Sequence, residues 1–280
     1  MIPRPVILLS LIMLLCIQAS LGSQDPEKKD NISSGETLLQ TNTTLSTAYC
    51  REVVNNLSGL INSLDFPDHF VEDAEKTDED FDVNQYFTVL DLLSMQPGYV
   101  LDYVYFSEGA GGEPVLYARK ADQPAYRNYT EFSKKNHGDS PLEEDDYLSH
   151  IQVDGTPEGF FQFVLLHIMG GQFYLFWHAN YDDDRIICDR SEASPNLADF
   201  GSAINGSTDP TFKEVLMEAR RLDFAPVVEM NEDAVRVQVV IFTNWGGFIR
   251  KSFTLSREFP HEILKEDSQV LVPYDCGIAF

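Results

Sequence analysis

The densest group of residues capable of chemistry lies in residues 177–184, which read WHANYDDD. His178 stands a few positions before the carboxylates of Asp182 and Asp184. An imidazole beside carboxylates can ligate a metal ion, or it can act as a general base whose pKa the neighbouring charges raise. We therefore take His178, Asp182 and Asp184 as candidate metal ligands. The competing interpretation, which we favour, is an acidic turn that closes a hairpin, with His178 hydrogen-bonded locally.

Familiar catalytic motifs fail at specific positions. His261 and Glu262 begin like a zinc-protease motif, but Lys265 stands where the second histidine ligand should be. The chain contains no phosphate-binding loop and no nucleophile elbow of the Gly-x-Ser-x-Gly type. The sequence therefore indicates no cofactor and no recognisable catalytic centre.

The carboxylates could still bind a hard cation. Residues 65–82 hold nine Asp or Glu against a single lysine, a composition that we interpret as solvated loops or helix starts. Asp78, Asp80 and Asp82 alternate as in a calcium-binding EF-hand loop. However, Val83 replaces the required glycine and Val89 the closing glutamate. Ca²⁺ thus remains the one ion that we consider, and without an established motif.

The cysteines suggest one disulfide. Cys50 falls on the apolar face of a predicted helix, where a buried free thiol is common. Cys188 ends a predicted strand, and Cys276 lies in a turn-like segment close to the C-terminus. We therefore predict a Cys188–Cys276 disulfide and a reduced, buried Cys50.

The N-terminus indicates export. One basic residue, Arg4, precedes an apolar run over residues 6–15, and residues 20–22 offer small side chains for cleavage before Ser23. The run is short for a membrane-spanning helix, which needs about 20 apolar residues, so we expect a secreted protein with no membrane span after cleavage. Residues 23–45 are polar and predict a disordered arm.

Charge and glycosylation motifs fit an extracellular protein. The formal net charge is −25, which disfavours nucleic acid and favours a basic partner. Five Asn-x-Ser/Thr sequons exceed the one or two that we expect by chance, and they predict a glycoprotein. They begin at Asn31, Asn42, Asn56, Asn128 and Asn205.

The elements around these residues follow from hydrophobic periodicity. We predict helices near residues 47–64, 86–93, 157–169 and 210–222, the third of them apolar almost all round. We predict one hairpin over 99–119 and a second over 172–188, whose turn would carry the candidate metal ligands. Further strands are expected near 226–230, 234–243 and 248–256.

Hairpins joined by short turns predict an α+β fold: a mainly antiparallel sheet with helices packed on one side, forming a single domain over residues 46–280. The expected function is that of a secreted acidic glycoprotein, an extracellular or cell-envelope binding module rather than an enzyme. Its partner would be a protein or a glycan, with a basic surface preferred. The alternative is a secreted hydrolase or metal-dependent enzyme with an unfamiliar site near His178.

Overall fold

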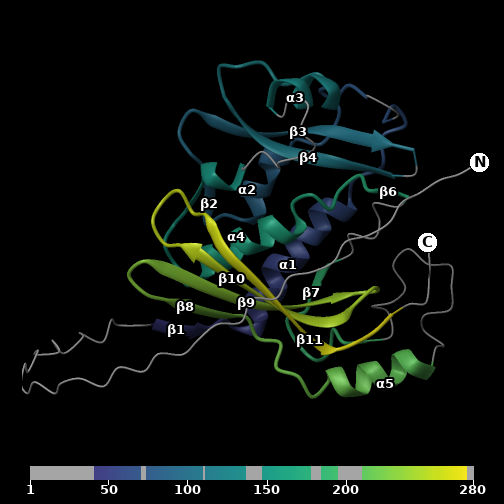
Figure 1. Ribbon diagram of the computed structural model, residues 1–280, viewed down its shortest axis with the longest axis vertical. Helices are drawn as coiled ribbons and strands as arrows, with labels where there is room; N and C mark the ends of the chain where they lie inside the picture. The colour runs from purple at the N-terminus through teal and green to yellow at the C-terminus, as the bar shows by residue number, and fades with distance from the viewer. Residues whose placement is uncertain are drawn as a thin grey trace, which may run out of the picture. The chain divides into compact units, whose positions relative to one another are not determined.

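The computed structural model describes residues 41–70, 74–109, 111–136, 147–177, 184–194 and 210–275, all within one compact unit, Leu38–Phe280. Figure 1 shows its elements in layers. Helix α3 covers the outer face of a small sheet, and helices α1, α2 and α4 lie between that sheet and a larger one. Helix α5 packs on the far face of the larger sheet.

The larger sheet is antiparallel, with the strand order β1-β8-β9-β10-β11. The short strand β7 pairs with β9 beyond the end of β8. Its strands are β1 (Thr41–Thr44), β7 (Arg185–Ile186), β8 (Val227–Met230), β9 (Ala234–Thr243), β10 (Gly247–Ser256) and β11 (Ile263–Val272).

The smaller sheet has the order β3-β4-β6, and a separate pair joins β2 to β5. These strands are β2 (Leu93–Met95), β3 (Tyr99–Glu108), β4 (Gly111–Lys120), β5 (Ile151–Val153) and β6 (Phe176–Trp177). In the hairpin β3–β4, Asp102 lies opposite Tyr117 and Val100 opposite Arg119. Strand β3 is therefore an edge strand, and its free edge faces the segment that precedes α2.

The helices are α1 (Thr47–Asn62), α2 (Tyr86–Val89), α3 (Tyr129–Asn136), α4 (Pro157–Met169) and α5 (Pro210–Ala219), with 3-10 turns η1 (Val83–Gln85) and η2 (Tyr147–His150). As predicted, α4 is buried nearly all round. Thr156 caps its first turn by accepting from the Gly159 N–H at 3.0 Å. Gln162, in the middle of α4, has a buried polar side chain that is hydrogen-bonded to the Leu92 N–H, the Tyr49 hydroxyl and the Asp91 carboxylate.

None of the described helices combines the length and the apolar character that crossing a bilayer requires.

The two faces of β9 enter different clusters. Val235, Val237, Val239 and Ile241 join the main core, which also contains the buried faces of α1 and α4. Val240 and Phe242 point the other way and pack with α5. The α+β class with antiparallel sheets is confirmed. The expected packing of helices on one side describes α1 and α4, whereas α5 occupies the opposite face.

Two sequence-based expectations are wrong. The predicted hairpin over 172–188 does not form, because β6 pairs with β4 in the small sheet and β7 pairs with β9 in the large one. The disordered arm predicted over residues 23–45 is wrong for Thr41–Thr44, which pairs with β8 as strand β1, and residues 23–40 lie outside the described residues. Both errors come from strand partners that lie far away in the sequence.

Candidate functional site

The predicted metal site is only partly covered by the structure. His178 and Asp182 lie outside the described residues. Asp184 is described, and its carboxylate forms an ion pair with Lys251 at 2.8 Å. Burial lowers the pKa of the Lys251 ammonium, but its bonds to Asp184 and Glu266 outweigh burial and raise that pKa above its ordinary value. No cluster of three or more His, Cys, Asp or Glu side chains in the described ranges is placed to hold a metal ion.

The disulfide prediction is wrong. Cys188 bonds to Cys50, with their Cα atoms 5.7 Å apart, and both cysteines are buried. Cys276 lies outside the described residues. Cys50 lies on the buried face of α1, as predicted, but it is disulfide-bonded and not reduced. The face of α1 that carries Cys50 packs against the segment after β7, and this contact is not visible in either local sequence.

Ion pairs surround this disulfide. Arg51 pairs with Asp189 at 2.8 Å and with Glu192 at 2.9 Å, so the residues next to the two cysteines also bind each other. Glu192 in addition accepts from the Cys188 N–H at 2.6 Å. The partner of Asp189 is therefore Arg51, on helix α1.

Three of the five sequon asparagines are described. Asn42 on β1 and Asn56 on α1 are exposed. Asn128 is half-buried and caps α3 by accepting from the Glu131 N–H at 2.9 Å. Asn31 and Asn205 lie outside the described residues.

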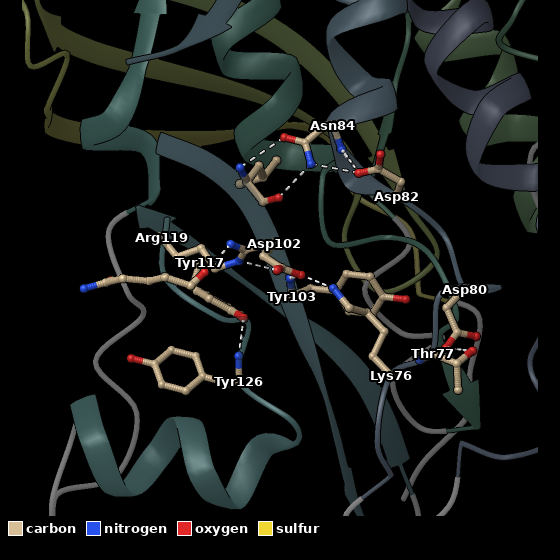
Figure 2. A network of polar contacts seen from close by, with 12 residues as sticks. Lys76, Thr77, Asp80, Asp82, Asn84, Asp102, Tyr103, Tyr117, Arg119 and Tyr126 are labelled. Carbon is tan, nitrogen blue, oxygen red and sulfur yellow. Dashed lines mark hydrogen bonds and ion pairs between the residues drawn. The ribbon is translucent and has the colours of Figure 1, made fainter. Parts of the chain in front are cut away.

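A pocket beside Asp102 is the best candidate site among the described residues. It has a volume of about 340 Å³ and is lined by residues 76–78, 80–84, 100–102 and 119. The walls therefore come from the acidic segment before α2 and from the edge of the hairpin β3–β4. Volumes of this size suit small-molecule ligands. Figure 2 shows the polar contacts that build it.

Asp102 is a buried carboxylate held by two cations. Arg119 donates from Nε to one carboxylate oxygen at 2.7 Å, and Lys76 Nζ bonds to the other. The Tyr103 N–H also donates to this second oxygen at 2.9 Å. A carboxylate this deeply buried is stable only when paired and hydrogen-bonded. The three contacts meet that requirement and fix the positions of both cations.

Each cation has a further contact. Arg119 donates from Nη1 to the Gln123 carbonyl at 2.6 Å, which holds the guanidinium against the end of β4. Lys76 Nζ lies 4.7 Å from the centre of the Tyr103 ring, a cation–π distance. Because Lys76 comes from the acidic segment, its bond to Asp102 attaches that segment to the sheet.

Local turns shape the acidic segment itself. The Asp80 carboxylate is buried and accepts from the Thr77 N–H at 2.6 Å and from the Thr77 hydroxyl at 3.0 Å. His69 Nε2 lies 3.0 Å from the same carboxylate oxygen. Asp82 caps the following 3-10 turn by accepting from the Asn84 N–H at 3.0 Å. The described part of the segment consists of turns whose carboxylates are mostly exposed, as expected of solvated loops or helix starts, and the bonds of Asp80 and Asp82 fix its course along the pocket.

Tyr103 carries an unusual hydroxyl. The side chain is fully buried, and its oxygen has no hydrogen-bond partner among the described residues. Burial raises the pKa of this hydroxyl far above its ordinary value, and the charges of Asp80, Tyr174 and Asp102 add to the effect. The phenol is therefore neutral, and its ring makes a cation–π contact with the Lys76 ammonium group.

The pocket presents both signs of charge. Within the described part of the chain, no acceptor bonds to Nη2 of Arg119, and the only acceptor bonded to Lys76 is Asp102. Asp78 is exposed at the lining, and its carboxylate has no partner among the described residues. The arrangement can bind an anionic group and a cationic group of one small ligand.

Sequence reasoning missed this pocket, although two signals were present. Lys76 is the only lysine or arginine in the acidic run 65–82, and Asp102 interrupts the otherwise apolar run 99–106. A charged side chain buried at an apolar position needs a partner of opposite charge, because an unpaired buried charge is costly. The sequence does not say which of the 20 Lys and Arg residues supplies it.

Comparison of the chain with protein-family models, with curated proteins and with solved structures gives no match.

Proposed function

We propose that this protein is exported and works as an extracellular binding module, with the pocket beside Asp102 as its ligand site. The leader-like residues 1–22 and the five sequons support export. The buried Cys50–Cys188 disulfide agrees with it, because such bonds persist mainly in oxidising compartments. The net charge of −25 makes nucleic acid an unfavourable partner.

The observation that carries the ligand site is the buried Asp102 with its two cations at the pocket wall. The protein has already met the cost of desolvating these charges, so a ligand encounters fixed donor groups. With Asp78 exposed on the same lining, the ligand that fits is a small zwitterion, such as a free amino acid. Its carboxylate would face Lys76 and Arg119, and its ammonium group would face Asp78.

The test is a binding survey of the full mature chain with the free L-amino acids, by calorimetry and thermal unfolding. Each amino acid is compared with its amide, which lacks the carboxylate, and with its N-acetyl derivative, which lacks the ammonium group. We expect at least one amino acid to bind and to raise the melting temperature, and both of its derivatives to bind more weakly.

Two variants locate the binding. Asp78→Asn removes the unpartnered carboxylate and should weaken binding about tenfold, the loss expected for one charged hydrogen bond. Glu79→Gln removes an adjacent exposed charge that does not line the pocket, and it should bind as the wild type does. If no amino acid binds, the ligand class is wrong. If Asp78→Asn and Glu79→Gln bind equally well, the pocket is the wrong site.

A further inference from the structure

A second surface of the protein is aromatic. Phe66 and Phe176 are 38% and 46% exposed, and their ring centres lie 5.5 Å apart. Three further rings support this pair: Phe66 meets Phe70, Tyr105 and Tyr174 at centroid distances of 6.1 to 6.4 Å. We call these five residues the aromatic patch. Phe66 and Phe176 form the exposed part of the patch, whereas Phe70 and Tyr105 are buried and support them. Neighbouring exposed aromatic rings, unlike a single exposed side chain, mark an interaction site.

Ring stacking and hydrogen bonds among the less exposed residues hold the patch in place. Phe70 stacks on Tyr105 with ring centres 4.3 Å apart. The Tyr105 hydroxyl donates to the Tyr174 carbonyl at 3.0 Å, and the Tyr174 hydroxyl accepts from the Phe81 N–H at 3.3 Å. Tyr174 has a φ of 51°, in the left-handed region that non-glycine residues seldom adopt. Its surroundings thus maintain a strained backbone, as is typical of functional surfaces.

Carboxylates border the patch. Asp65 precedes Phe66 and is exposed. Glu113 is exposed and follows Gly112, the partner of Phe176 in the strand pairing. Burial raises the pKa of the Tyr174 hydroxyl, and the charges of Asp80 and Asp65 raise it further. Burial and the charge of Glu113 raise the pKa of the Tyr105 hydroxyl in the same way. Both carboxylates are therefore close enough for the aromatic groups to feel their charge.

We propose that the aromatic patch is a docking site for a basic segment of a partner protein, with an arginine side chain stacked on Phe66 and Phe176. Aromatic faces attract guanidinium groups by cation–π interaction, and the exposed carboxylate of Asp65 supplies an ion pair. A second copy of this chain is a poor occupant, because each copy carries a net charge of −25. This docking requires no ligand in the pocket beside Asp102, so the two proposals can fail separately.

The experiment measures binding of fluorescein-labelled hexa-arginine to the full mature chain by fluorescence anisotropy at near-physiological ionic strength. The test variant is Phe66→Leu/Phe176→Leu, which keeps apolar side chains in place but removes both rings. Leu264→Ala/Val270→Ala is the matched control, because these side chains are exposed apolar residues of β11, outside the patch. Circular dichroism and unfolding curves check that every variant is folded. Asp65→Asn tests the contribution of the carboxylate next to the patch. Because Asp65 is exposed, this variant should fold, so the proposal remains testable if the double variant unfolds.

We expect the ring-free variant to bind hexa-arginine at least about fivefold more weakly than the wild type, as two exposed cation–π contacts predict. The Leu264→Ala/Val270→Ala control should match the wild type, and Asp65→Asn should weaken binding by a smaller factor. Removing the two rings should weaken the binding of hexa-lysine by a smaller factor than the binding of hexa-arginine, because the planar guanidinium group stacks better on an aromatic ring than the ammonium group does. Equal binding by wild type and ring-free variant would show general attraction by the acidic surface and overturn the proposal. So would an absence of hexa-arginine binding, or self-association of the chain that the ring-free variant abolishes.

Discussion

The side-chain amide of Asn84 bonds to both backbone groups of Leu101 on the free edge of β3. Its Oδ1 accepts from the Leu101 N–H at 3.1 Å, and its Nδ2 donates to the Leu101 carbonyl at 2.9 Å. The amide thus takes the place of a neighbouring strand at this position (Figure 2). An exposed edge is a site for unwanted strand pairing, and covering it is a common solution.

Asn84→Ala should destabilise the protein by about 2 kcal/mol, because it removes the partners of two backbone groups of a buried residue. Asn84→Asp should cost at least as much, since a carboxylate cannot donate to the Leu101 carbonyl. The control is Gln85→Ala at the adjacent, exposed position, which should have little effect. Urea unfolding measures all three, and equal stabilities for Asn84→Ala and Gln85→Ala would contradict the role of this amide.

Asp102→Asn should cost about 3 kcal/mol or more, because it leaves Lys76 and Arg119 close together without a buried counter-charge. Asp78→Asn changes an exposed carboxylate of the same pocket and should leave the stability almost unchanged. Chemical unfolding curves compare the two. A small loss in Asp102→Asn would mean that the ion pairs add little to the fold.

Cys50→Ala/Cys188→Ala should lower the melting temperature strongly. The two cysteines are 138 residues apart in the sequence. The entropy of closing a loop of this length predicts that the disulfide stabilises the fold by up to about 5 kcal/mol. Cys276→Ser should be close to neutral by comparison, because Cys276 is not part of this bond. Peptide mapping without reduction should link Cys50 to Cys188, and a Cys188–Cys276 peptide would refute the pairing.

The stability should fall as the pH is lowered through the ordinary pKa of histidine, about 6.5, and His261 should contribute to this. Burial lowers the pKa of His261 in the folded protein, although its contact with the Ser256 carbonyl at 3.3 Å opposes the shift. The imidazole packs against Phe160 and Phe163. Below the ordinary pKa the unfolded chain therefore binds a proton that the folded protein does not, which favours unfolding. Above that pKa His261 is neutral in both states and has no such effect.

Thermal unfolding between about pH 7 and pH 5 measures the effect, which has a limiting slope of about 1.4 kcal/mol per pH unit for one proton. His261→Phe should reduce the slope, whereas Gln85→Ala, which changes an exposed side chain without a titratable group, serves as the control for general mutational effects. The slopes of wild type and His261→Phe would coincide if His261 were protonated equally in both states.

Local periodicity was enough to predict several elements. The apolar stripe of α1, the all-round apolar α4 with Thr156 and a proline at its start, and the hairpin β3–β4 were all expected within a few residues. Strands β8, β9 and β10 were also predicted. Strand β11 was missed, because most of its residues are exposed and show no alternation. Strand β11 forms because its backbone pairs with that of β10 in an antiparallel arrangement.

The sequence by itself determined the charge, the sequons, the leader-like N-terminus and the elements whose pattern depends on neighbouring residues. Only the tertiary structure decided the partners. It paired Cys188 with Cys50, separated β6 from β7, and brought Lys76 and Arg119 to Asp102. The physical reason is that periodicity records which side of an element is buried. Which distant groups meet there depends on the path of the whole chain and on the requirement that every buried charge and strand edge finds a partner.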